Sequence, residues 1–101
     1  MARIYPLFSS SKGNSTFIGE PNGGILIDAG VSFKKLTAAL TDSGLSLASI
    51  RGIFITHSHS DHVKGLKMLT KKTGLPVFGQ RETLEELISG EMIAPACEVY
   101  E

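Results

Sequence analysis

The feature that most constrains this chain is a run of metal-ligand residues between an apolar strand and an amphipathic helix. All three histidines of the 101 residues fall within six positions, in the run His57-Ser58-His59-Ser60-Asp61-His62. The preceding segment Gly52–Thr56 is short and apolar, as a buried strand is, and Val63–Lys72 repeats the helical spacing of apolar residues. The run therefore occupies a loop that joins a strand to a helix.

The residue types in this loop suit a divalent metal. Imidazole nitrogen and carboxylate oxygen together favour zinc, manganese or ferrous iron. In an extended backbone alternate side chains point the same way, so His57, His59 and Asp61 can face one side of the loop. His62 can turn toward the same side where the helix begins. Two histidines can then hold one metal while Asp61 and His62 hold a second, about 3.5–4 Å away. The competing interpretation is a polar loop or a degenerate site without metal.

Short strands and helices alternate along the rest of the chain, which predicts an α/β domain. Asn22-Gly23 is typical of a tight turn and predicts a hairpin over residues 15–28. Ser32 is a good N-cap for a helix that Gly44 ends. The expected strands are Arg3–Phe8, Ser15–Gly19, Gly24–Asp28, Gly52–Thr56, Leu75–Gly79 and Glu98–Tyr100; the expected helices are Phe33–Ser43, Val63–Lys72 and Arg81–Ser89, with a small polar loop at Ser9–Asn14 and one further turn at Ser46–Ile50.

Composition narrows the class of protein. A chain of 101 residues fits one small domain, so residues 1–101 are expected to form a single domain. Ten basic and ten acidic residues balance, so no overall field draws the chain to nucleic acid or anionic lipid. The single cysteine, Cys97, excludes a disulfide framework within the chain and a Cys-rich zinc module. The apolar runs are too short to span a bilayer and no secretory signal is visible, so no membrane contact and a cytoplasmic location are expected.

The loop and its leading threonine resemble the metal-binding motif of the metallo-β-lactamase-fold hydrolases. The run Thr56-His57-Ser58-His59-Ser60-Asp61-His62 carries the resemblance. Upstream, Ile25-Leu26-Ile27-Asp28-Ala29-Gly30 resembles a strand of that superfamily that ends in an aspartate and a glycine near the metals. The segment Ser9-Ser10-Ser11-Lys12-Gly13-Asn14-Ser15 is similar to a loop of the bacterial YycJ (WalJ) group. The resemblance covers most of residues 3–80 and implies half of an αββα sandwich, a mixed β-sheet flanked by helices.

The resemblance also implies a role for each matching position. His57 and His59 would ligate the first metal. Asp61 and His62 would ligate the second, and Asp61 would also contact the nucleophilic water. Asp28 would hydrogen-bond near the ligands and fix their orientation, the alternative being an ordinary strand-end turn. The metals would be two zinc ions, with manganese or iron as alternatives. The residues that would border the substrate cavity, or else form an ordinary surface turn, are Ser10, Ser11, Gly13 and Asn14.

The chain departs from this family by lacking a second half. No histidine follows His62, and Asp61 is the last aspartate, so the further histidines and bridging aspartate of a complete member are missing. The chain is then a fragment, a truncated product or one half of an assembly, and alone it is expected to be inactive or nearly so. Its sheet would expose one apolar face, which a second copy in a homodimer or a C-terminal half would cover.

Metal-dependent hydrolysis is the function expected of the complete form. The likeness to the YycJ group favours a phosphodiester, in DNA, in RNA or in a small molecule, while ester, lactone and thioester substrates stay open. Two rival classes remain, a non-catalytic metal-binding module and a small zinc-stapled interaction domain that chelators would unfold. Lys64, Lys67 and Lys71 share a helical stripe that could steer a polyanion, although a solvated helix face is the favoured interpretation.

Overall fold

One mixed sheet of six strands forms the frame of the domain. The computed structural model describes residues 3–101. The strands cross the sheet in sequence order, with β1 to β3 antiparallel and β3 to β6 parallel. The strands are β1 (Arg3–Ser10), β2 (Gly13–Glu20), β3 (Gly23–Ile27), β4 (Ile50–Phe54), β5 (Val77–Phe78) and β6 (Val99–Tyr100), and the helices are α1 (Phe33–Asp42), the 3₁₀ turn η1 (Leu47–Ser49), α2 (Ser60–Val63), α3 (Leu66–Thr73) and α4 (Arg81–Ser89).

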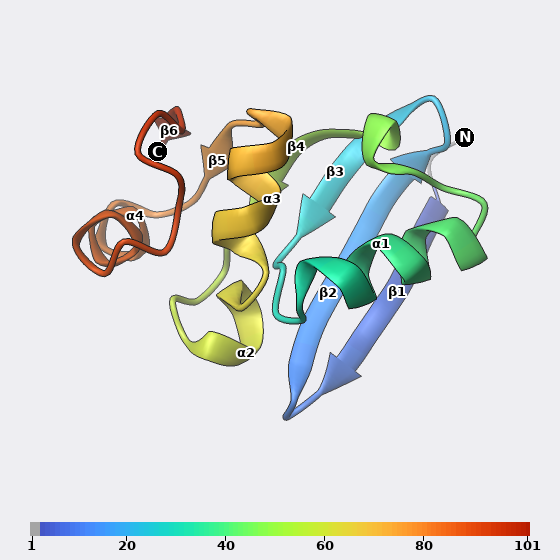
Figure 1. Cartoon of the computed structure of the whole chain (residues 1–101), viewed down its shortest axis with the longest axis horizontal. Coiled ribbons are helices and arrows are strands. Elements are labelled where there is room, and N and C mark those ends of the chain that lie inside the picture. The colour runs from blue at the N-terminus through green and yellow to red at the C-terminus, as the bar shows by residue number, and fades with distance from the viewer. Residues whose placement is uncertain (1–2) are drawn as a thin grey trace.

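Helices cover one face of this sheet. Figure 1 shows α1 lying in front of β1 and β2 and α3 lying in front of β4. Each of the longer helices buries leucines at helical spacing, and the strands bury the side chains at alternate positions, as an amphipathic layer on a half-buried sheet requires. The core side chains that are fully inaccessible are Phe17, Leu26, Ala29, Leu36, Leu40, Ile53, Leu66, Leu69, Val77 and Leu87.

The opposite face of the sheet presents large apolar side chains to solvent. Strand register places them on one face, because directly paired residues point the same way: Ile18 pairs with Ile25, and Phe54 pairs with Phe78. The ring of Phe78 lies over Gly52 of β4, which is between the isoleucine pair on β2 and β3 and the phenylalanine pair on β4 and β5, so the side chains form one row. Each side chain in the row is between 37% and 70% exposed. We call this patch the open face; it consists of Ile4, Ile18, Ile25, Phe54, Phe78 and Tyr100.

Capping residues and glycines in the sequence predicted where α1 begins and where α1 and α3 end. Ser32 is the N-cap of α1, and its Oγ accepts a hydrogen bond from the backbone N–H of Lys35 at 3.3 Å. Gly44 and Gly74 follow α1 and α3 with φ of +79° and +70°, the left-handed backbone that glycine adopts without strain. The prediction of α4 is confirmed over Arg81–Ser89. Among residues 3–101, no helix is both long and apolar enough to cross a membrane.

The prediction of a polar loop at Ser9–Asn14 is wrong. β1 continues to Ser10 and β2 begins at Gly13, so only residues 11 and 12 form the turn. The segment pairs because its side chains are small, and because Gly13 must lie against the next loop: a Cβ there would meet Val31 Cγ1 at 2.5 Å. The expected substrate loop is therefore the tip of a hairpin.

The helix predicted over Val63–Lys72 is also wrong in one respect, because it is two helices. α2 ends at Val63 and α3 begins at Leu66. Gly65 separates them, donating its backbone N–H to the carbonyl of Ala29 at 2.8 Å. The remaining differences are small shifts of strand ends: β3 stops at Ile27, β4 covers residues 50–54, and β5 and β6 are two residues each.

Candidate metal centre

The histidine loop lies at the carboxyl ends of the parallel strands β3 and β4. β3 ends at Ile27 and β4 at Phe54, and Figure 1 shows α2 beside this edge of the sheet. The loop 28–30 after β3 is tied to α2 by backbone bonds from Ala29 N–H to the His62 carbonyl at 2.7 Å and from Gly65 N–H to the Ala29 carbonyl at 2.8 Å. This edge of a parallel sheet is where ligands bind in open α/β folds.

The carboxylate of Asp28 forms hydrogen bonds with two other residues of the site, Thr56 and His62. Its backbone adopts a φ of +62°, and its side chain is 7% exposed. One carboxylate oxygen, Oδ1, accepts the backbone N–H of Thr56 at 2.8 Å, and Oδ2 accepts the Thr56 hydroxyl at 2.6 Å. Oδ2 also lies 2.7 Å from Nδ1 of His62. Because a carboxylate can only accept, Nδ1 of His62 carries the proton and Nε2 presents its lone pair.

The second ring nitrogen of His62 lies beside Asp61. His62 Nε2 and Asp61 Oδ2 are 3.5 Å apart. Two ligands of one tetrahedral metal are separated by about 3.4 Å when each metal–ligand bond is about 2.1 Å. The spacing of Asp61 and His62 therefore fits the pair that the sequence assigned to a shared ion.

His57 and His59 lie nearby but do not close the site. The ring of His57 is 4.7 Å from the ring of His62, whereas the rings of His57 and His59 are 6.2 Å apart and nearly parallel. Imidazoles that share a tetrahedral metal have centroids about 5 Å apart and edges that converge. Over residues 3–101, no three histidine, cysteine, aspartate or glutamate side chains converge on a point that could hold an ion. The rings of His57 and His59 are both exposed to solvent. The four side chains are of the types that bind a divalent metal, but only Asp61 and His62 are spaced as two ligands of one ion.

Two residues outside the predicted ligand set organise it. The hydroxyl of Thr56 donates to Asp28 and lies 3.0 Å from Nδ1 of His57, so its oxygen can accept the proton that this ring nitrogen carries. Asn14 donates its amide to Asp61 Oδ2 and to the Asp61 carbonyl, both at 3.3 Å. Thr56 stood in the motif without a role. Sequence alone could not place residue 14 beside residue 61, because β2, β3 and β4 must pair first.

The other residues of the predicted substrate loop lie farther from the ligands. Ser10 supplies its carbonyl to the Asn14 amide at 3.1 Å and its hydroxyl to the backbone N–H of Lys12 at 3.2 Å. Ser11 is exposed at the hairpin tip, and Gly13 is buried under the 30–31 loop. Gly30 lies so close to the Asp61 carbonyl that a side chain there would collide with it. That Ser10, Ser11 and Gly13 border a substrate cavity stays a prediction.

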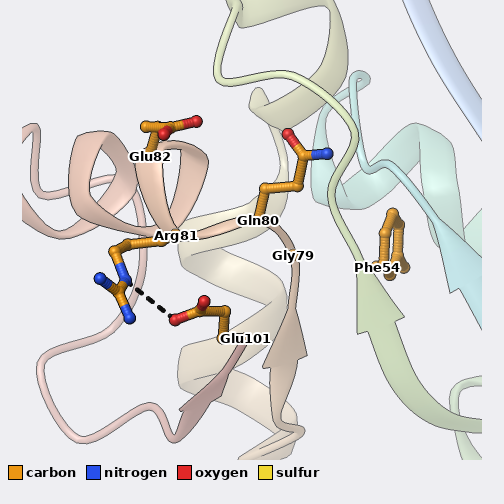
Figure 2. A pocket seen from close by; sticks show the side chains of 6 residues that line it. All are labelled: Phe54, Gly79, Gln80, Arg81, Glu82 and Glu101. Carbon is orange, nitrogen blue, oxygen red and sulfur yellow. Dashed lines mark hydrogen bonds and ion pairs between the residues drawn. The ribbon is translucent and has the colours of Figure 1, made fainter.

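Another depression on the described surface lies farther along the same carboxyl edge, beyond the ends of β4, β5 and β6. Figure 2 shows it lined by Phe54, Gln80 and the ion pair in which Arg81 Nε donates to Glu101 Oε1 at 3.0 Å. Its volume is about 570 Å³, and no residue of the histidine loop lines it. Cys97 also lies apart from the loop, and burial raises the pKa of its thiol, so thiolate chemistry is disfavoured there.

Comparison with known proteins identifies the family of the chain. A sequence model of the Metallo-beta-lactamase superfamily matches residues 11–96. The chain is 40% identical over 85 residues to Exodeoxyribonuclease YycJ of Bacillus anthracis, covering 81% of this chain and 32% of that protein. It is 35% identical over 81 residues to Exodeoxyribonuclease WalJ of Streptococcus pneumoniae, covering 80% and 30% of the two chains. The Anti-Pycsar protein Apyc1 of Bacillus phage vB_BsuM-Goe3 is 46% identical over 83 residues, covering 81% and 30%.

Solved structures show the same fold. The Rm3 metallo-beta-lactamase superposes with a TM-score of 0.71 at 29% identity, covering 91% of this chain and 37% of that one. A metallo-beta-lactamase of Cronobacter sakazakii gives a TM-score of 0.71 at 29% identity, covering 80% and 33%. The chain thus spans about a third of the length of the relatives it matches. With its mixed sheet, flanking helices and histidine loop, this chain belongs to the metallo-beta-lactamase superfamily.

Proposed function

We propose that the chain contributes half of the metal site of a hydrolase that cleaves phosphodiesters in nucleic acid. One observation carries the proposal: Asp28 holds Nδ1 of His62, so that Nε2 of His62 and the Asp61 carboxylate lie 3.5 Å apart at the carboxyl edge of the sheet. The choice of substrate is supported by the 40% identity to a protein named as an exodeoxyribonuclease. Ester and thioester substrates are the alternative.

Each residue of the proposed site has a distinct task. His57 and His59 would hold one divalent ion, and Asp61 and His62 a second, with zinc as the proposed metal and manganese or iron as alternatives. Bound there, such ions would supply the Lewis acidity that makes water a nucleophile at neutral pH. Asp28 keeps the proton of His62 on Nδ1. Asn14 holds the Asp61 carboxylate in place with its amide, and Asp61 would also contact the attacking water.

We expect the 101-residue chain alone to bind metal weakly and to turn over little. Four ligand side chains are available and no histidine or aspartate follows His62. The separation of the His57 and His59 rings agrees with this, because closing the first metal position requires both exposed rings to turn.

Metal content and hydrolysis measured together test this function. The chain is dialysed to equilibrium against zinc or manganese, and the metal per chain in excess of the outer buffer is measured by mass spectrometry. Hydrolysis of bis(4-nitrophenyl) phosphate and of 5′-labelled single-stranded DNA is then followed. We expect bound metal that is lost in His59→Ala and kept in Ser58→Ala, with turnover far below a typical enzyme rate of about 10 s⁻¹. Absence of bound metal with both ions would overturn the metal site.

The remaining outcomes separate the rival functions. Unfolding of the loaded chain by a chelator, with no turnover under any condition, would favour a zinc-stapled interaction module. Turnover at a normal enzyme rate would support the hydrolase and overturn the expectation that the chain is inactive alone.

We further propose that a second copy of the chain covers the open face in solution. Its six side chains together expose on the order of 500 Å², since large side chains of this kind each present 150–250 Å². Two such patches bury about 1,000 Å², the lower limit for a specific interface. The relatives are more than twice as long, and a C-terminal half of the fold would be the alternative cover for this face. Sedimentation that shows a folded monomer at micromolar concentration would exclude the homodimer.

The proposed location is the cytoplasm. A nucleic-acid substrate is found there, and the one thiol, Cys97, is free and partly buried. Cell fractionation with an antibody against the chain tests this location.

A further inference from the structure

Three lysines that are distant in sequence surround one depression beside the histidine loop, residues 57–62, which we also call the metal loop. Lys12 comes from the tip of the β1–β2 hairpin, Lys35 from α1, and Lys64 from the end of α2. The depression has a volume of about 480 Å³. We call it the lysine depression; its lining residues are Ser11, Lys12, Lys35, Ser60, Asp61 and Lys64.

The charge of this depression is positive although the chain as a whole is neutral. All three lysines are exposed, and within residues 3–101 no carboxylate lies within ion-pair distance of any of them. Asp61 is the single acid among the lining residues. Its Oδ2 faces Asn14 and His62, on the side of the metal loop, rather than a lysine. Three unopposed ammonium groups and the hydroxyls of Ser11 and Ser60 therefore face an incoming ligand.

The form of the depression favours an extended polyanion over a single small anion. A compact phosphate pocket is built from backbone N–H groups or buried donors that enclose the anion. Here the donors are flexible, exposed lysines on three separate elements, which suits a ligand whose negative charge repeats along its length. The depression also shares Asp61 with the metal loop, so a strand lying in it passes directly beside the proposed catalytic centre.

We propose that the lysine depression binds the phosphodiester backbone of single-stranded nucleic acid and leads the strand to the metal loop. The proposal rests on the proposed nuclease function and adds to it the surface that grips the substrate. Phosphate contacts carry no sequence information, and no lining residue stacks on a base, so the contacts are expected to be independent of sequence. The same chemistry serves DNA and RNA.

Binding without catalysis tests this surface separately from the metal site. Anisotropy of a fluorescein-labelled 12-nucleotide DNA is measured with the intact chain in EDTA, at several salt concentrations. The triple variant K12Q/K35Q/K64Q is compared with K67Q/K71Q/K72Q, which removes the same charge from exposed lysines of α3. We expect the first triple to weaken binding at least tenfold and to lower the salt slope by about 2, since each phosphate contact on a single strand contributes about 0.7. The control triple should change affinity less than threefold.

Other outcomes have defined meanings. Equal weakening by both triples would overturn the proposal in favour of general charge, and no weakening by the first triple would overturn it outright. Should the triple variant fail to fold by circular dichroism, K35Q alone should weaken binding two- to threefold, against no change for K71Q. RNA of the same sequence should bind within threefold of DNA, and a tenfold preference would contradict backbone recognition. A chain that holds no metal in the metal-content assay but shows lysine-dependent DNA binding in EDTA would refute the metal site of the hydrolase and not the lysine depression.

Discussion

At the scale of single residues, Asp28 decides the geometry of the site. A left-handed backbone is costly for a residue with a side chain, and aspartate is among the few that tolerate it. Here the unusual φ turns the carboxylate back toward Thr56 and His62, and three hydrogen bonds from these two residues hold it there. Asp28 was expected near the ligands on resemblance alone, and the contacts now give that expectation a physical basis.

Replacing Asp28 by asparagine should weaken metal binding while keeping the fold. Asparagine tolerates the same backbone conformation, but its side chain cannot accept from both Thr56 and His62 with two charged oxygens. We expect zinc affinity to fall 10–100-fold, the range found when a carboxylate behind a metal-bound histidine is removed. Competition with a chromophoric chelator measures the affinity, and Ser58→Ala on the same loop is the control. An unchanged affinity in Asp28→Asn would refute the orienting role.

At the scale of elements, the break between α2 and α3 keeps the metal loop against the sheet. A continuous helix over residues 60–73 would be favoured by its own hydrogen bonds. The structure interrupts it at Gly65, whose backbone lies against the loop at residues 29–33. The short α2 is thereby free to tilt, and His62 reaches Asp28.

In Gly65→Ala, helix propensity and this packing change the free energy of unfolding in opposite directions. Propensity alone predicts that Gly65→Ala stabilises a helix by up to about 1 kcal/mol. Because a Cβ would collide with the carbonyl of Val31, we expect instead a loss of 1–3 kcal/mol, the usual range for overpacking a tight contact. Urea unfolding followed by circular dichroism measures the change, with Lys67→Ala on the exposed side of α3 as a control. A gain in stability for Gly65→Ala would show that the contact relaxes without cost.

At the scale of the whole molecule, helices cover one face of the sheet and leave the other face exposed to solvent. The helical side buries a continuous core of leucines and β-branched residues. The other side presents the open face, whose large side chains cross all six strands. A patch of about 500 Å² is near the upper end of what monomers expose, and patches of this size are often binding surfaces.

A charge on the open face should separate association from folding. Ile25 and Ile88 are 47% and 54% exposed, the first in the middle of the open face and the second on α4. Ile25→Lys should raise the dimer dissociation constant at least tenfold, because an ammonium group would be desolvated in the interface. Ile88→Lys makes the same change outside the interface and should leave the constant within twofold. Analytical ultracentrifugation measures both, and equal effects of the two variants would place the interface elsewhere.

The sequence by itself determined what depends on neighbours along the chain: the strand-loop-helix unit that carries the candidate ligands at 57–62, the Ser32 cap and Gly44 stop of α1, and the bounds of α4. These follow from periodicity, backbone conformation and hydrogen bonds that span a few residues. Tertiary structure alone decided that the 9–14 segment pairs as strand, that Gly65 splits a helix, that Asn14 and Asp28 meet the metal loop, and that three lysines share one depression. These arrangements bring together residues up to 52 positions apart along the chain, and they depend on the order of the strands in the sheet, which no local pattern encodes.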